Sequence, residues 1–290
     1  MLEFIRAGAE VSRWIDGAVI VRLGPGTGVS RFPAMPHAML TMRLARSASR
    51  SKLSAALCPP VTFHTLTTGP VAYVHEGGIT ALGLLVRPEA AACLLGEASG
   101  AIVDQVLPWS VLAGAPEASR LEEGIDRSGN DNARIDALID SFCRTMSAVS
   151  RGRDQAYSRL CAALGRHGAL AGDELGIGRR QIERRCHAVL GLAPKQFQRI
   201  VRFHQALSMA VSGNASRLTT LAHDAGFYDQ SHLARDARLL AGATLGQLQS
   251  QARPDLSWWP LAARADRARA QPSYLGQAKQ IASRPNVDPI

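Results

Sequence analysis

In the C-terminal third of the chain, apolar residues recur every three or four positions, which is the spacing of one face of a helix. The stretch 173–190 predicts a short helix, a turn, and a longer helix that begins at Arg179. Gly176 supplies the positive φ that a tight turn between helices requires, and Gly178 is an acceptable N-cap. The apolar positions that should face inward on the longer helix are Ile182, Cys186, Val189 and Leu190.

The same pattern returns about fifty residues later. A short helix with apolar residues Leu218, Leu221, Ala222 and Ala225 is followed by Gly226 in the turn and by a helix whose N-cap is Asp229. Phe227 is placed to fill the space between these two helices, and Leu233, Ala237 and Leu240 should face inward. The segment that joins the two repeats opens at Pro194 and predicts one helix with Phe197, Ile200, Val201, His204, Leu207 and Val211 at helical spacing. The sequence therefore predicts two helix-turn-helix units held apart by a connecting helix.

The outward faces of the two longer helices carry the candidate chemistry. The first presents Arg179, Arg180, Glu183, Arg184, Arg185 and His187, and the second presents Gln230, Ser231, His232, Arg235 and Arg238. Arginine and glutamine can contact base edges, whereas serine and histidine are equally suited to phosphate. For a single helix, a solvated charged face explains such residues about as well. Two such faces at fixed separation favour contact with successive major grooves of DNA.

In this region the chain resembles the AraC/XylS family of bacterial transcription regulators. The resemblance rests on LGIGRRQIERR (175–185), GLAPKQFQRIVRFHQAL (191–207) and AGFYDQSHLARDAR (225–238), within about 100 of the 290 residues. It implies that the third and sixth helices of the domain enter adjacent major grooves on one face of the duplex. By position, the base-facing residues are Arg180, Glu183 and Arg184 in the first unit and Gln230, Ser231, His232 and Arg235 in the second, and Arg179 is a further DNA-binding candidate.

The chain departs from the family pattern at several core positions. Ala237 and Leu248 replace aromatic residues, Leu245 replaces a proline, and Gln249 replaces a basic residue. Cys186 also stands where the first unit usually has a bulky side chain. Loss of a large core side chain costs about 3 to 5 kcal/mol unless neighbours refill the space. We therefore expect less firmly seated recognition helices, or compensation in the second unit by packing of Trp258 and Trp259.

The N-terminal half has a different pattern. Short alternating or β-branched runs at 18–23, 39–44, 61–66, 71–75 and 79–86 predict strands, and the last two predict a hairpin that turns at Gly77 and Gly78. Helices are expected from Pro88 and over about 133–149, the latter with Ile135, Leu138, Ile139, Phe142, Met146 and Val149 inward. The expected fold class is α+β, with a cupin-like β-barrel or sandwich followed by an all-α domain with two helix-turn-helix units. The stretches LLVRPEAAACLLG and DQVLPWSVLAG also resemble the sensor domains attached to one branch of the same family.

Length and charge agree with this division. The expected domains are an effector-sensing or dimerisation domain at 1–150, a DNA-binding domain at 151–251 and a basic, mobile tail at 252–290. Of the net charge of +9, residues 154–251 carry 12 basic against 7 acidic side chains, whereas residues 1–153 carry 15 against 14. No apolar run has the length of a membrane span, and the N-terminus lacks a signal-peptide core, so a cytoplasmic protein is expected. The five cysteines, Cys58, Cys93, Cys143, Cys161 and Cys186, are widely spaced and are expected to be small buried hydrophobes.

Three functions compete at this point. The first is a sequence-specific transcription regulator without enzymatic activity or cofactor, whose expected partners are double-stranded DNA, a small-molecule effector, RNA polymerase and a second copy of the chain, with no membrane partner. The second is a metal-dependent cupin enzyme fused to a DNA-binding domain, for which His37, His64 and the pair His75–Glu76 are the only candidate ligands and which metal analysis would reveal. The third is a DNA-repair alkyltransferase, which ranks last because no cysteine has the expected reactive context. The regulator is the leading hypothesis, with an effector pocket inside the strand-rich half.

Overall fold

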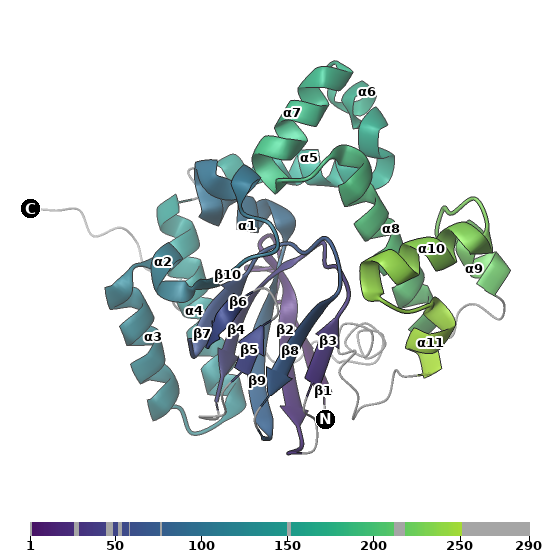
Figure 1. Ribbon diagram of the computed structural model, residues 1–290. Helices are drawn as coiled ribbons and strands as arrows, with labels where there is room; N and C mark the ends of the chain where they lie inside the picture. Colours follow the sequence, from purple (N-terminus) through teal and green to yellow (C-terminus); the bar gives the residue numbers. More distant parts are fainter. Residues whose placement is uncertain are drawn as a thin grey trace, which may run out of the picture.

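The structure is a computed structural model that describes residues 2–25, 29–44, 49–51, 54–57, 59–75, 77–149, 152–211 and 218–250. A strand-rich unit occupies the first half of the chain. The helices of the second half lie above it and to its right in the view of Figure 1. The expected tail at 252–290, with Trp258 and Trp259, lies outside the described residues, as do Cys58 and Glu76.

Two antiparallel sheets form the strand-rich unit. The six-stranded sheet has the order β1 (Leu2–Arg6), β2 (Ile15–Leu23), β9 (Ile79–Val86), β4 (Ala38–Arg43), β7 (Val61–His64) and β10 (Val106–Pro108). The four-stranded sheet has the order β3 (Val29–Phe32), β8 (Val71–His75), β5 (Ser49–Ser51) and β6 (Ser54–Leu57). A β-barrel or a sandwich was predicted; among the described residues the sheets do not close into a barrel, and their arrangement is compatible with a sandwich.

Alternation along the strands produces two separate apolar clusters. On β4, Leu40 and Met42 are buried in the main core, while the half-buried Met39 points to the opposite face of the sheet. This second face carries a small cluster of Phe4, Val19, Met35 and Leu85, with Val21, Phe32 and Met39 against it. Because successive side chains of a strand point to opposite faces, one strand contributes to both clusters. The main core, in contrast, is one cluster that contains residues from both halves of the chain, from Val11 in the first half to Leu248 in the second.

The hairpin predicted at Gly77 and Gly78 is wrong. β8 pairs with β3 and β5 in the four-stranded sheet, whereas β9 pairs with β2 and β4 in the six-stranded sheet. The short connection, in which Gly77 has a φ of 99°, carries the chain from one sheet to the other. The reason lies in burial: β9 is almost continuously apolar and suits a central strand, whereas Tyr73, Val74 and His75 of β8 keep exposed surface.

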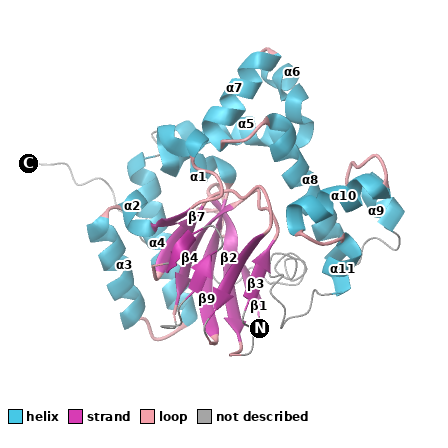
Figure 2. Cartoon of the chain, in the orientation of Figure 1, coloured by secondary structure: helices cyan, strands magenta, loops and turns pink. Residues whose placement is uncertain are grey.

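Four helices contribute to the main core against the six-stranded sheet; in Figure 2 the first of them lies above the sheets and the other three lie at the left. They are α1 (Pro88–Leu95), α2 (Trp109–Ala113), α3 (Ala115–Arg127) and α4 (Asp131–Val149), and a 3-10 turn, η1 (Gly96–Ala101), follows α1. The predicted inward residues of α4 are buried except Val149, which is half-buried.

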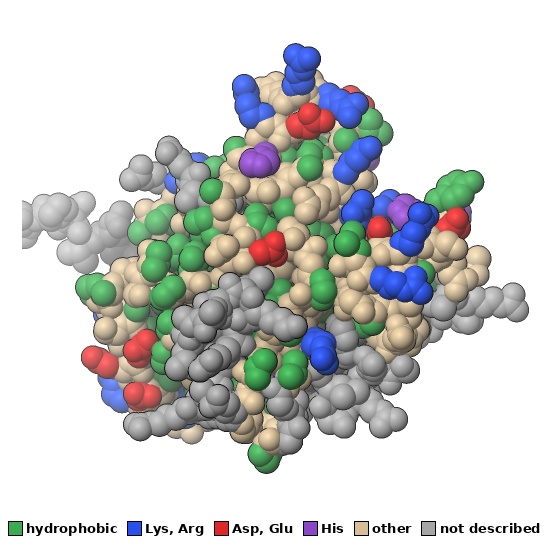
Figure 3. All heavy atoms as spheres, viewed as in Figure 1, with side chains coloured by type: hydrophobic (Ala, Val, Ile, Leu, Met, Phe, Trp, Pro, Cys, Tyr) green, Lys and Arg blue, Asp and Glu red, His purple; other side chains and the backbone are tan. Residues whose placement is uncertain are grey.

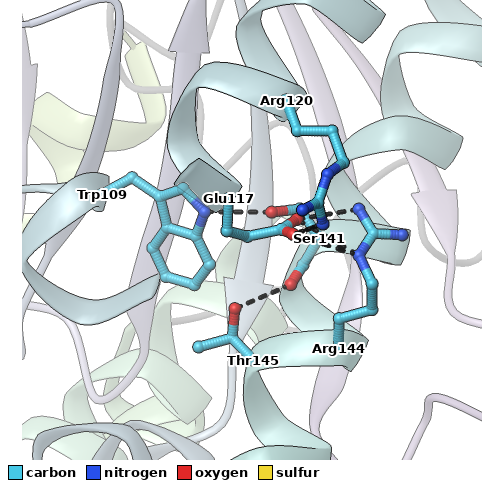
Figure 4. Close-up of polar contacts among 6 residues, drawn as sticks. All are labelled: Trp109, Glu117, Arg120, Ser141, Arg144 and Thr145. Carbon is cyan, nitrogen blue, oxygen red and sulfur yellow. Dashed lines mark hydrogen bonds and ion pairs between the residues drawn. The ribbon is translucent and has the colours of Figure 1, made fainter. Parts of the chain in front are cut away.

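Polar contacts join α2, α3 and α4 at one place (Figure 4). The indole Nε1 of Trp109 donates to Ser141 Oγ at 3.1 Å, and Arg144 Nη2 donates to Glu117 Oε1 at 2.8 Å. Burial favours a raised pKa for Glu117, but hydrogen bonds from Arg144 and Ser141 and the charges of Arg144 and Arg120 outweigh it and lower the pKa. These contacts fix the polar group of a fully buried tryptophan, whose indole N–H would otherwise be unsatisfied.

The rest of the described chain is helical. The elements are α5 (Arg153–His167), η2 (Gly168–Leu170), α6 (Ala171–Leu175), α7 (Arg179–Leu190), α8 (Pro194–Val211), α9 (Leu218–Asp224), α10 (Gln230–Ala241) and α11 (Leu245–Ser250). α6 and α7 form the first unit (residues 171–190), α9 and α10 the second unit (residues 218–241), and α8 runs between them (Figure 1). The prediction of two units joined by one continuous helix is confirmed.

Of the four cysteines among the described residues, three are buried as predicted. Cys93 lies on α1, Cys161 on α5 and Cys186 on α7, while Cys143 on α4 is half-buried. Burial raises the pKa of the Cys186 thiol to about 12 and that of Cys143 to about 11, so these thiols stay protonated and behave as small apolar groups.

Candidate nucleic-acid interface

The two units close their turns with the same backbone hydrogen bonds. The amide of Ile177 donates to the carbonyl of Gly172 at 2.9 Å, and the amide of Phe227 donates to that of Ala222 at 2.8 Å. The residues just before, Gly176 and Gly226, have φ values of 64° and 76°. This is the Schellman arrangement, in which a left-handed residue lets the following amide satisfy a carbonyl at the end of the first helix. The repeat seen in the sequence is therefore a repeat of backbone geometry.

α7 of the first unit follows the predicted division into an inner and an outer face. Ile182, Cys186, Val189 and Leu190 are buried. The candidate residues Arg179, Arg180, Glu183 and Arg184 are exposed, as are Arg185 and His187. Arg179 Nε pairs with Glu183 Oε1 at 3.2 Å, one helical turn away. Three exposed arginines of this helix thus have no ion pair with Glu183 and remain available for an anionic partner.

α10 of the second unit begins at the predicted N-cap. The carboxylate of Asp229 accepts from the backbone amide of His232 at 2.6 Å and satisfies one of the amides that lack an intrahelical partner. Gln230, Ser231 and Arg235 are exposed. His232 is half-buried, with its ring 5.4 Å from that of Phe227 and its Nε2 atom 3.7 Å from Asp236 Oδ2. His232 therefore faces the interior of the unit as well as its surface.

Charged residues behind α10 tie it to α8. Asp236 is buried, with Arg199 Nε at 3.6 Å and Arg202 Nη2 at 3.9 Å from its carboxylate. Arg202 also donates to the carbonyl of Gly226 at 3.1 Å and lies 4.7 Å above the ring of Phe227. The contacts of Arg202 thus link α8 to both the turn and the recognition helix of the second unit. No role was predicted for Arg199, Arg202 or Asp236. The signals that could have suggested one are the i, i+3 spacing of the two arginines on α8 and the single acidic residue within the basic helix α10.

The second unit and the helix after it depart from the family pattern at three buried positions. Ala237, Leu245 and Leu248 are all buried, and the last two belong to α11, which packs on α8 and α10. Another residue that sequence reasoning missed is Tyr228, whose surface is 91 % exposed directly before the N-cap of α10. A helix that enters the major groove directs its N-terminal residues at base edges, and the ring of Tyr228 lies beside the N-terminus of α10.

Basic side chains gather on the surface over both units. In Figure 3, blue side chains lie over α6 and α7 at the top and over α8 and α10 at the right, with few red ones between them. Positive charge placed around two recognition helices suits a polyanion with repeated grooves.

A second cluster of polar residues lies in the strand-rich unit. His64 Nδ1 is 2.7 Å from the Tyr73 hydroxyl, and His64 Nε2 is 2.8 Å from Thr41 Oγ1 and 2.9 Å from Thr62 Oγ1. Burial, and to a smaller extent the charge of Arg43, lowers the pKa of His64 to about 4. The imidazole is therefore neutral near pH 7, and its contacts join uncharged groups. The contact with Tyr73 on β8 links the two sheets, whereas Thr41 and Thr62 lie in the same sheet as His64.

We expect the stability of the chain to fall as the pH drops from 6.5 to 4, in part because of His64. Unfolded, its imidazole titrates near 6.5, so between these values the unfolded state binds more protons than the folded state. Since His64 retains some accessible surface, we discount the effect to about 1 to 3 kcal/mol. Urea unfolding at pH 7 and pH 4.5 should show a smaller pH dependence for His64→Gln than for the natural chain. The exposed His223, changed to Gln, should leave the dependence unaltered, and an equal slope in all three chains would contradict this account.

The candidate metal ligands of the strand-rich unit do not converge. His37 Nε2 contacts Asp16 Oδ2 at 2.8 Å, His64 contacts Tyr73 and two threonines, and His75 Nε2 contacts Ser30 Oγ at 2.6 Å. In the part of the chain that the structure describes, no three His, Cys, Asp or Glu side chains are grouped so that they could hold a metal ion. None of the helices in this part combines the length and hydropathy that a membrane span requires.

Comparisons with known proteins bear on the two halves differently. Residues 172–251 match a family model described as a helix-turn-helix domain. No curated protein matches the chain. Among solved structures, ToxT from Vibrio cholerae is similar with a TM-score of 0.49 and 9 % identity, over 80 % of this chain and 97 % of that chain. ToxT bound to (E)-4-(8-methylnaphthalen-1-yl)but-3-enoic acid gives a TM-score of 0.48 and 10 % identity over 80 % and 97 %. These TM-scores are too low for the likeness to support an argument.

The family model begins in α6 and ends in α11, and so covers both units and the connecting helix. It coincides with the stretch in which the turns repeat and the arginines are exposed. Residues 172–251 of this chain are therefore a helix-turn-helix domain of the AraC/XylS type.

Proposed function

We propose that this chain is a sequence-specific DNA-binding transcription regulator in which α7 and α10 each enter a major groove. The observation that carries the proposal is the pair of identically built units with exposed Arg and Gln side chains on their second helices. In this proposal the DNA-contacting residues are Arg179, Arg180, Glu183 and Arg184 on α7 and Gln230, Ser231, His232 and Arg235 on α10. All of them except Arg179 face the bases. The DNA-binding unit spans 151–251.

We further propose that residues 1–150 receive a small organic effector between the two sheets. The facing surfaces of the sheets offer an apolar cluster around Val19 and Leu85 and, close by on β4 and β7, the neutral hydrogen-bonding group around His64. Such a combination of apolar lining and a few polar groups is typical of small-molecule sites. The proposed regulator is not an enzyme, and its protein partners are RNA polymerase and a second copy of the chain.

The proposal predicts separate losses of affinity for two arginine variants. Arg184→Ala and Arg235→Ala should each weaken binding to a specific duplex by about 1 to 3 kcal/mol, because each removes a side chain placed to contact a base edge. Binding to scrambled DNA at the same salt concentration should change much less. Band-shift titrations with both duplexes measure the difference.

Arg127→Ala is the matched control, since this arginine is 74 % exposed on α3, far along the chain from either unit. It should bind both duplexes as the natural chain does. Equal losses on specific and scrambled DNA for Arg184→Ala and Arg235→Ala would reduce these residues to phosphate contacts and argue against base recognition.

A further inference from the structure

The last turn of α10 ends against the strand-rich unit. The backbone amide of Ala34 donates to the carbonyl of Leu240 at 2.6 Å. Leu240 lies among the last residues of α10, whose carbonyls have no partner within the helix. An amide from a segment more than two hundred residues earlier therefore completes the end of the second recognition helix.

The carbonyl of Ala34 binds a side chain of α8. His204, which is buried on α8, has its Nε2 atom 2.5 Å from Ala34 O. A carbonyl oxygen only accepts, so Nε2 must carry the proton and donate it. Both peptide groups of Ala34, which is fully buried, are thus used to hold α8 and α10 together against the strand-rich unit.

The segment that carries Ala34 is held firmly. We call residues 33–36 the docking segment; it reads Pro33, Ala34, Met35, Pro36. Proline fixes its own φ and restricts the residue before it to extended conformations, so this segment has few alternative shapes. The amide of Met35 donates to Thr67 Oγ1 at 2.8 Å, and its side chain is buried in the cluster between the sheets. A displacement of the docking segment would therefore disturb the sandwich itself.

The first unit touches the strand-rich unit at another place. A Cβ added at Gly100 of η1 would lie 2.7 Å from the carbonyl oxygen of His187 and 3.2 Å from Ala188 Cα, so only glycine permits this approach to α7. At both contacts the recognition helices meet the strand-rich unit through their C-terminal halves, and Arg184 and Arg235 remain exposed. The contacts leave the proposed DNA-facing surfaces open.

We propose that the strand-rich unit sets the relative placement of the two recognition helices, and that His204 is the positioning residue that selects the spacing of the two DNA elements. This rests on the proposed function, in which both units contact DNA. α8 alone is one connection between the units, and side-chain repacking at either end would let them turn relative to each other. Attachment of the first unit at η1 and of the second unit at the docking segment joins the two units through the N-terminal half as well as through α8, and removes that freedom.

The test uses a duplex selected from random-sequence DNA by the full-length chain, and variants in which the spacer between the two protected elements is one or two base pairs shorter or longer. The natural chain should lose affinity steeply, about tenfold or more for two base pairs, because each base pair turns one element by about 34°. His204→Leu lacks the donor and should bind all spacers within about threefold of one another. His204→Gln keeps an N–H donor and should restore the steep dependence.

Two further measurements separate this inference from a general loss of structure. Each element alone should bind His204→Leu as tightly as the natural chain, and circular dichroism should show the same helix content. If His204→Leu does not fold, His204→Asn, whose amide is too short to reach Ala34, replaces it. A variant that keeps the steep spacer dependence, or loses affinity equally for every spacer and for single elements, overturns the role of His204. A natural chain that protects only one element overturns the proposed function instead.

Discussion

Insertion of about five base pairs between the two DNA elements is expected to abolish tight binding by the natural chain. Half a helical turn moves the second element to the opposite face of the duplex, whereas the two units present their recognition helices on one molecule with fixed separation. α8 is continuous from Pro194 to Val211, so it cannot follow such a rotation without losing its packing. The loss of all base contacts from one unit should lower the affinity on the order of 100-fold or more, since each good pair contributes about 1 to 3 kcal/mol.

Footprinting and band-shift titration on the native and expanded sites measure this effect. Insertion of about ten base pairs returns the second element to the same face of the duplex and changes only the distance between the elements, so it is the control. Because the two helices expose different residues, the two elements need not be palindromic. Unchanged affinity for the expanded site would mean that one unit alone contacts bases.

Phe227→Ala is expected to lower the free energy of unfolding by about 3 to 5 kcal/mol and to disable the second unit. The ring is 3 % exposed, follows the left-handed Gly226, and contacts both Arg202 and His232. Ala222, whose carbonyl accepts from the Phe227 amide, and the nearby Ala225 are small, so they offer little side-chain volume to fill the cavity. Denaturant unfolding measures the loss, and footprinting should show that protection of the second element disappears while that of the first remains.

The adjacent Tyr228 is the matched control for stability. Its surface is 91 % exposed, and Tyr228→Ala should change the free energy of unfolding by less than about 0.5 kcal/mol. Similar stabilities for the two variants would show that Phe227 does not hold the second unit together.

The residues of the second unit and of α11 that differ from the family pattern lie in the core. The sequence indicated a thinned core at Ala237, Leu245 and Leu248, and the structure buries all three. Support for the end of this unit comes from Ala34, in a segment that the sequence analysis did not connect with it. The two hydrogen bonds use the backbone atoms of Ala34 and one histidine side chain, so they could not be predicted from the side chains near Ala34.

The local features of the helical half could be predicted from short stretches of sequence. Helical spacing of Ile182 and Leu233, glycine at two turns and Asp229 at an N-cap follow from short-range sterics and hydrogen bonding, and the structure has each of them where the sequence places it. The outer faces of α7 and α10 follow from the same periodicity, because a helix with one apolar stripe has only one way to bury it.

The pairing of the strands and the contacts between the two halves of the chain depend on the tertiary structure. β8 and β9 are neighbours in sequence but lie in different sheets, because pairing depends on which strands can bury both faces and not on the length of the turn. His64 contacts Tyr73 across the two sheets, and Ala34 contacts His204 and Leu240 across 170 or more residues of chain. Such contacts depend on the packing of distant elements, which local periodicity does not encode.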